Sequence, residues 1–210
     1  TWEFMAFPSS LPYVNLYLLN IGQAIVVIFL AADFLKRDKK VDTNEVLYTR
    51  SMSNFEYVLG KTWGIMKLFL GLNIIILFIA LIINIVNKIV AIDILAYLQY
   101  LVLISVPTLT FSLGIAFMLM MVLRNQAITF LILLGMAAGN MFWGYYRLGG
   151  IFDYMAFGFP LLKSQITGFD NLSLILYQRG MFFFLGMALI FSTIILFNRL
   201  PQSKTHTALS

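Results

Sequence analysis

Five long apolar stretches, each almost free of charge, leave this chain few ways to fold in water. They lie at about residues 12–35, 63–86, 95–123, 126–145 and 174–197. A helix that crosses a bilayer needs roughly 20 mostly apolar residues. Only 11% of the residues are charged and 61% are hydrophobic, whereas soluble domains carry about 25% charged residues. We therefore predict an all-α, polytopic helical membrane protein with a single transmembrane domain over residues 1–210.

Three polar side chains lie in the first apolar stretch, where no charge occurs between Glu3 and Asp33. They are Asn15, Asn20 and Gln23. Polar groups in a membrane helix commonly bond to neighbouring helices. The alternative is that they line a path for a transported substrate, and the sequence leaves both interpretations open.

The charge of the chain is concentrated in one polar stretch, residues 36–61, and in the three residues before it. These 29 positions hold 6 of the 14 basic and 5 of the 9 acidic residues. Such a concentration favours a docking surface for a soluble partner. The alternative is a solvated loop that places positive charge on the cytoplasmic side of the membrane.

Two helix starts are predicted in this polar stretch. Asp42 or Thr43 is suited to cap a short helix that ends near Thr49. Ser53 and Glu56 have the spacing of a capping box, in which each side chain bonds the other residue's amide. A helix that starts there and reaches the end of the second apolar stretch would be roughly 50 Å long. Since a bilayer core is only about 30 Å thick, its first turns should stand outside the membrane.

Two features of the later stretches predict how their helices bend and pack. Pro107 interrupts the third stretch, and we expect nearby Ser and Thr side chains to satisfy the carbonyl that it frees. In the fourth stretch, Gly135 and Gly139 have the small-xxx-small spacing that lets two helices approach closely.

Residues 146–171 are too broken to span a membrane and too apolar for a solvated loop. They are rich in aromatic residues and glycine, with isolated charges. Aromatic rings sit well at the level of lipid headgroups. We predict a re-entrant or interfacial loop on the side opposite the polar stretch.

The basic residues also predict the topology. With the polar stretch in the cytoplasm, ten of the 14 basic residues lie inside and four outside, namely Lys88, Arg147, Lys163 and Arg179. The C-terminus is then cytoplasmic and residue 1 lies outside. Because the chain starts at Thr1 without a signal peptide, we expect one further span before it.

Most catalytic chemistry is disfavoured by the residues present. The chain has no Cys and one His, His206, so a zinc site is not expected. No phosphate-binding GxxxxGK[ST] motif occurs, and we find no ionisable groups facing each other within the apolar stretches. We therefore expect no catalytic residues, no metal and no cofactor on this chain, and no nucleic-acid partner, because its basic residues sit beside apolar spans.

The polar stretch and its surroundings resemble the permease subunits of ABC-2 type transporters, closest to bacterial ones of the Bacteroidetes type. The first span ends in AADFLKRD at residues 31–38, followed by TNEVLYTRSMSNFEYVLGK at residues 43–61. The second segment is similar to the family's cytoplasmic loop, which often has Pro where this chain has Ser51. The loop before the last span and the ending NRLPQ are also similar, so the resemblance covers spans two to six of a six-span half.

The resemblance implies a transporter subunit of the bacterial inner membrane that is not itself an enzyme. Residues 42–53 would form a coupling helix docked on a separate dimeric ATPase, which holds ATP and Mg, and a second permease half would complete the path. The implied docking residues are Thr43, Glu45, Val46, Tyr48, Thr49 and Arg50; Ser53, Glu56 and Lys61 would cap and anchor; Asn15, Asn20 and Gln23 would line the path. Residues 146–171 would be an outer gate or a set of interfacial anchors. The competing hypotheses are a membrane-embedded enzyme and a non-transporting scaffold with a permease-like fold.

Overall fold

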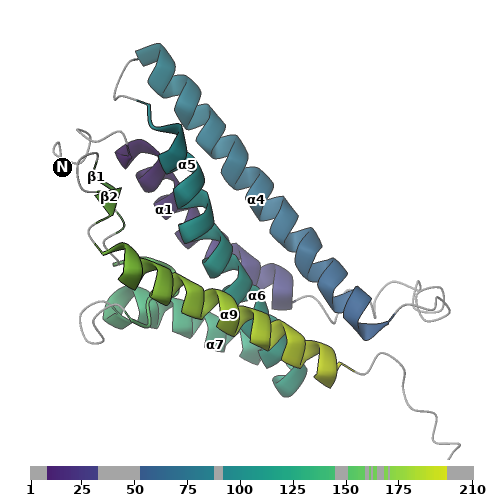
Figure 1. Ribbon diagram of the computed structural model, residues 1–210. Helices are drawn as coiled ribbons and strands as arrows, with labels where there is room; N and C mark the ends of the chain where they lie inside the picture. Colours follow the sequence, from purple (N-terminus) through teal and green to yellow (C-terminus); the bar gives the residue numbers. More distant parts are fainter. Residues whose placement is uncertain are drawn as a thin grey trace, which may run out of the picture.

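The protein is a bundle of apolar helices, as predicted (Figure 1). A computed structural model describes residues 9–32, 53–87, 92–144, 151–158, 161, 163–164, 168–169 and 171–197. The helices are α1 (Ser10–Ala32), α4 (Asn54–Asn87), α5 (Ile94–Tyr100), α6 (Val106–Leu123), α7 (Gln126–Gly139) and α9 (Leu172–Leu196). Two π-helical turns, η2 (Leu101–Ser105) and η3 (Asn140–Gly144), extend α5 and α7. A short antiparallel ribbon pairs β1 (Lys163–Ser164) with β2 (Gly168–Phe169).

Within the described residues, four helical segments are long and apolar enough to cross a membrane, whereas five spans were predicted. They are Ser10–Leu30, Asn54–Val86, Ile94–Leu123 and Leu172–Leu196. The predicted fourth span, at residues 126–145, is a shorter apolar helix over Gln126–Phe142, about 25 Å long at 1.5 Å per residue. It begins abruptly because Arg124 adopts a left-handed conformation and the Asn125 side chain caps α7.

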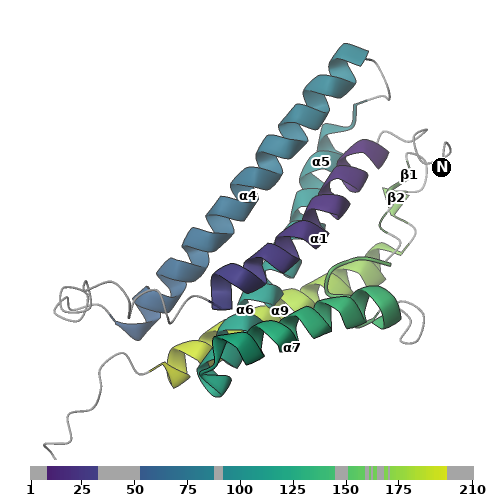
Figure 2. The same ribbon diagram turned by 180° about the vertical axis from the view of Figure 1, so that it is seen from behind.

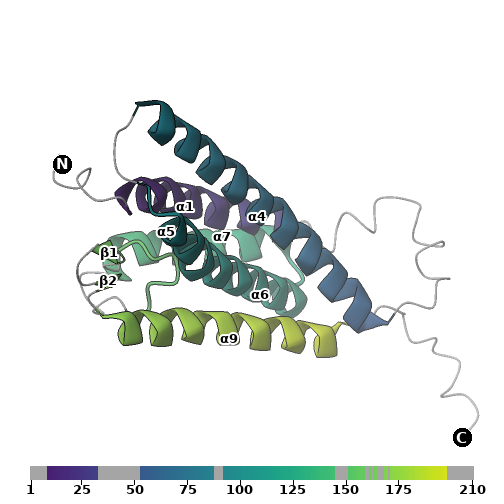
Figure 3. The same cartoon turned by 45° about the horizontal axis from the view of Figure 1, so that its top comes forward.

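Helices α4 and α9 form the two arms of a wedge, and α1, α5 and α6 lie between them (Figures 1 and 3). The arms meet where α4 begins and α9 ends. There the Asn54 side chain donates a hydrogen bond of 2.6 Å to the Phe197 carbonyl, and the rings of Tyr57 and Phe197 stack 5.2 Å apart. Seen from behind, α7 lies across the bundle next to α1 and α6 (Figure 2).

The closest helix packing joins α6 to α9 through two glycines. A Cβ atom on Gly114 would lie 2.5 Å from the Gly186 carbonyl oxygen, and one on Gly186 would lie 2.6 Å from the Phe111 nitrogen. Only glycine permits backbones this close. No described residue makes the close approach expected at Gly135 and Gly139, since a Cβ on either would meet none of their atoms within 4 Å.

Pro107 is accommodated by a change of helix type. It lies in the first turn of α6, directly after the π-helical turn η2, and such turns are a common cause of local helix distortion. The nearby hydroxyl groups bond elsewhere, and Thr110 donates to the Val106 carbonyl. Ser105 donates to the Asn73 side chain, and Thr108 donates to the Tyr154 carbonyl.

Candidate functional site

The described part of the predicted re-entrant loop turns into the interior of the bundle. We refer to residues 151–158 as the re-entrant segment. Ile151 and Phe152 are exposed, whereas the four residues from Asp153 to Ala156 are at most 7% exposed. A backbone buried in this way must find hydrogen-bond partners inside the protein.

Side chains from three helices supply these partners. The Asp153 carbonyl accepts hydrogen bonds from Arg179 and Gln178 of α9. The Tyr154 carbonyl accepts from Arg179 (3.2 Å) and from Thr108 of α6 (2.8 Å). The Met155 carbonyl accepts from Asn20 of α1. Three consecutive carbonyl groups are therefore anchored to α1, α6 and α9.

The turn that presents these carbonyls has an unusual backbone conformation. Ala156 has φ 58°, a left-handed conformation that costs an L-residue roughly 1–2 kcal/mol. It is 1% exposed. Such conformations persist only where the surroundings determine them, and they cluster at functional sites.

Two opposite charges are buried beneath this turn. Arg179 is 2% exposed and Asp153 is 1% exposed. The Asp153 carboxylate accepts hydrogen bonds from the Asn140 side chain (2.8 Å) and the Gly158 amide (2.7 Å), and it attracts the Arg179 guanidinium. A charge removed from water needs this kind of compensation.

Sequence reasoning missed this pair, since it found no ionisable groups facing each other and grouped Arg179 with the surface charges. Asp153 is an isolated charge between two apolar spans in the sequence, and the inward fold of the re-entrant segment buries it. The signal that could have found the pair is the dipeptide Gln178–Arg179. Both residues are polar and lie within a helix that is otherwise apolar, where an ionisable side chain usually has a partner.

A continuous chain of buried hydrogen bonds leads from α4 to the re-entrant segment. Its five members, which we call the polar chain, are each at most 2% exposed: Ser105, Asn73, Gln23, Asn20 and Thr108. Asn73 of α4 accepts from Ser105 (2.8 Å) and donates to the Gln23 side chain (2.7 Å).

The remaining hydrogen bonds of the polar chain lead from Gln23 to the re-entrant segment. Gln23 donates to the Asn20 oxygen at 2.8 Å, and Asn20 donates to the Thr108 hydroxyl at 3.2 Å. Thr108 ends the polar chain on the Tyr154 carbonyl. The polar chain thus connects α4, α1 and α6 to the re-entrant segment.

Asn15, Asn20 and Gln23 were expected either to bond neighbouring helices or to line a path for a substrate. Asn20 and Gln23 make interhelical hydrogen bonds, as the first of the two interpretations predicts. Asn15 lies apart from them and donates to the Leu11 carbonyl of its own helix (2.8 Å).

The predicted capping box at the start of α4 is present. The Glu56 amide donates to the Ser53 hydroxyl (3.2 Å), and the Ser53 amide donates to the Glu56 carboxylate (2.8 Å). Lys61 lies 5.0 Å from the centroid of the Tyr57 ring, at the junction of α4 and α9. The predicted docking residues lie outside the described part of the chain: Thr43, Glu45, Val46, Tyr48, Thr49 and Arg50.

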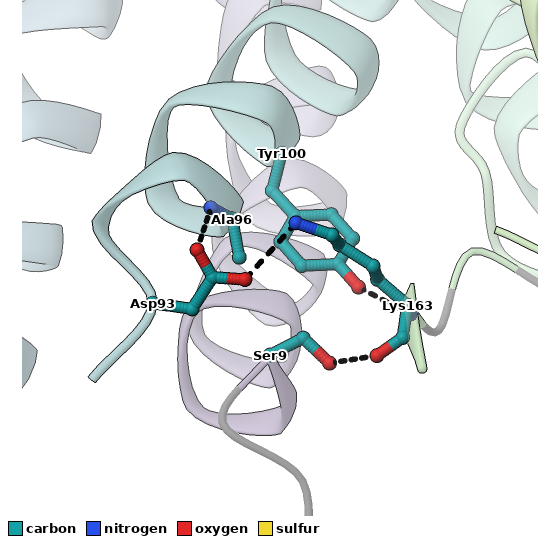
Figure 4. Close-up of polar contacts among 5 residues, drawn as sticks. All are labelled: Ser9, Asp93, Ala96, Tyr100 and Lys163. Carbon is teal, nitrogen blue, oxygen red and sulfur yellow. Dashed lines mark hydrogen bonds and ion pairs between the residues drawn. The ribbon is translucent and has the colours of Figure 1, made fainter. Parts of the chain in front are cut away.

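At the opposite end of the bundle, Lys163 of β1 ties the ribbon to two helices (Figure 4). Its ammonium group pairs with Asp93 at 3.0 Å, and its amide donates to the Tyr100 hydroxyl at 2.8 Å. Its carbonyl accepts from Ser9, the residue before α1. The hydrogen bond from Lys163 holds the pKa of the Asp93 carboxyl below its usual value, and the Ala96 amide adds to this effect.

The described residues thus form a site that positions and connects structural elements. Among them, no three His, Asp or Glu side chains lie close enough together to hold a metal ion. Comparison of the chain with protein-family models, with curated proteins and with solved structures finds no match.

Proposed function

We propose that this chain is the membrane-spanning permease half of an ATP-binding-cassette transporter of the ABC-2 type. It would lie in a bacterial inner membrane and move its substrate with energy from a separate ATPase subunit docked on residues 42–53. The observation that carries the proposal is helix α4. Its 34 residues run without interruption from a capping box that lies within the polar stretch.

The dimensions of α4 suit it to transmit movement. At 1.5 Å per residue it is about 51 Å long, against about 30 Å for a bilayer core. A displacement at its capped end would therefore be carried into the membrane as a rigid-body movement. Asn54 and Tyr57 hold that end to Phe197, so α9 would move with it.

In this proposal ATP hydrolysis takes place on the partner ATPase subunit and not on this chain. ATP and Mg would bind to the dimeric ATPase subunit, and this chain would hold no cofactor. A second permease half, identical or homologous, would complete the translocation path within the lipid bilayer.

The proposal is tested by replacing residues 45–50 with Gly and Ser in the affinity-tagged chain. The unchanged chain should co-purify with a subunit that hydrolyses ATP, and the replacement should abolish both the capture and the hydrolysis. A matched Gly/Ser replacement of residues 202–207 should change neither. Undiminished ATP hydrolysis with residues 45–50 replaced would refute the proposed docking.

The bonding of the polar chain favours one alternative, a non-transporting membrane scaffold. Asn20 and Gln23 bond to each other and to neighbouring helices, which is what a purely structural core requires. A scaffold would keep its membrane partners when residues 45–50 are replaced, so the same experiment separates the two functions.

A further inference from the structure

We propose that the polar chain couples movement of α4 to the re-entrant segment, with Asn73 and Gln23 as the positioning residues of that link. The inference rests on the proposed function in one respect: the docked ATPase subunit would supply the movement of α4. Its structural basis is independent of any partner, because every contact lies within the described residues.

The first argument is that the link between α4 and α1 is specific and buried. Asn73 and Gln23 join the two helices by a side-chain hydrogen bond of 2.7 Å, and both residues are at most 2% exposed. If α4 moved alone, each amide would lose a partner where water cannot replace it, which is costly. Movement of α4 therefore favours a matching movement of α1.

The second argument is that the polar chain ends on the backbone of the re-entrant segment. Asn20 binds the Met155 carbonyl and Thr108 binds the Tyr154 carbonyl. Asn20 and Thr108 also bond to each other. A shift of either donor changes the anchoring of two consecutive residues of the segment.

The third argument is that the backbone is irregular where the polar chain meets it. Ser105 ends the π-helical turn η2 and Thr108 follows Pro107, so both lie beside a break in regular helix geometry. On the segment itself, Ala156 is held in a left-handed conformation. An irregular backbone can absorb a change in dihedral angles. Coupling requires an element with two alternative conformations, and the re-entrant segment could change conformation at these positions.

The test uses the fact that the chain contains no cysteine. A single cysteine in the variant Met155→Cys reports on the re-entrant segment, because Met155 is 0% exposed. A second reporter, Ile190→Cys, lies in α9 at a residue that is 1% exposed. The rate of reaction with N-ethylmaleimide is measured for each in the purified chain.

We expect Asn73→Leu to raise the labelling rate of the residue 155 reporter about tenfold, since a lost buried hydrogen bond shifts a local opening equilibrium by that order. The residue 190 reporter should be unchanged. The matched control is Thr62→Val, which removes only a buried hydrogen bond to Val58 within α4 and should affect neither reporter.

A second variant keeps the test decisive if Asn73→Leu folds poorly. Gln23→Leu removes the same link from the α1 side and should have the same effect. The double variant should raise the rate by less than the product of the two single effects, because both substitutions remove the Asn73–Gln23 hydrogen bond. Unchanged labelling of the residue 155 reporter, or an equal rise at both reporters, would overturn the coupling.

The coupling and the proposed function can fail separately. If the selective rise occurs in the purified chain but no ATPase partner exists, the coupling stands and the proposed function is wrong. If the ATPase binds and residue 155 stays protected in Asn73→Leu, the proposed function stands and the coupling is wrong.

Discussion

Arg179 connects helix α9 to the re-entrant segment in the interior of the bundle. Its guanidinium binds two consecutive backbone carbonyls, and its Nε atom donates to Gln178 at 2.7 Å. It therefore fixes the re-entrant segment to α9 while the Asp153 carboxylate balances its charge. A residue in this position stabilises one particular packing of the segment.

Replacement of Arg179 by Met should destabilise the protein by about 3–5 kcal/mol. It leaves the buried Asp153 carboxylate without an opposite charge and removes one of the two hydrogen-bond donors from each of the Asp153 and Tyr154 carbonyls. The measurement is denaturant unfolding in detergent. Arg124→Met is the control, since Arg124 is exposed. Equal stability of the two variants would contradict the assigned role.

The Asp93–Lys163 pair predicts a defined pH dependence. The folded-state pKa of Asp93 is lowered, so the pair contributes stability above the unfolded pKa of about 3.9 and loses it as the pH falls through the folded pKa. Wild type should therefore melt at a higher temperature than Asp93→Asn at pH 7. The difference in melting temperature should shrink as the pH falls below about 4 and vanish once the pH is below the folded-state pKa. A difference that does not shrink in acid would contradict the assignment.

At the scale of elements, the contact between α6 and α9 is the least tolerant of added volume. Gly186→Ala would place a methyl group against the backbone of Thr110 and Phe111 and should cost at least about 1–3 kcal/mol. Gly180→Ala, in the same helix with open space around it, should be neutral or stabilising by up to about 1 kcal/mol. Unfolding of the two variants provides the comparison, and indistinguishable values would contradict the close approach.

The start of α4 depends on its cap. Ser53→Ala should cost about 0.5–2 kcal/mol and speed amide exchange in the first turn of α4, where Glu56 loses its hydroxyl partner. Exchange at the middle of α4 should be unchanged. Ser192→Ala serves as the control, since that hydroxyl bonds only within α9, to Ala188.

The elements that could be predicted from the sequence are those determined locally. The capping box at Ser53 and the long apolar helix that follows it both depend on residues within a few turns of each other. The contact of Gly114 with Gly186 and the burial of Asp153 beneath Arg179 depend on residues far apart in the chain. Neither apolar periodicity nor spacing encodes which glycine faces which helix, so Gly135 and Gly139 looked equally suitable.

At the scale of the whole molecule, the closed end of the wedge is where α4 begins and α9 ends. The ribbon of β1 and β2 lies at the opposite, open end (Figures 1 and 3). The polar chain runs through the interior between α4 and the re-entrant segment. In the proposed transporter, a displacement at the start of α4 would reach the re-entrant segment through the polar chain.

The central claim is that an ATPase subunit docks on residues 42–53, and site-specific crosslinking at Tyr48 tests it most directly. A photoreactive amino acid replaces Tyr48 in the native host, and the crosslinked product is identified by mass spectrometry. We expect a crosslink to an ATP-binding subunit, and none when the reactive group is placed at Phe142, an exposed residue of η3. Crosslinking of Tyr48 to lipid alone would contradict it.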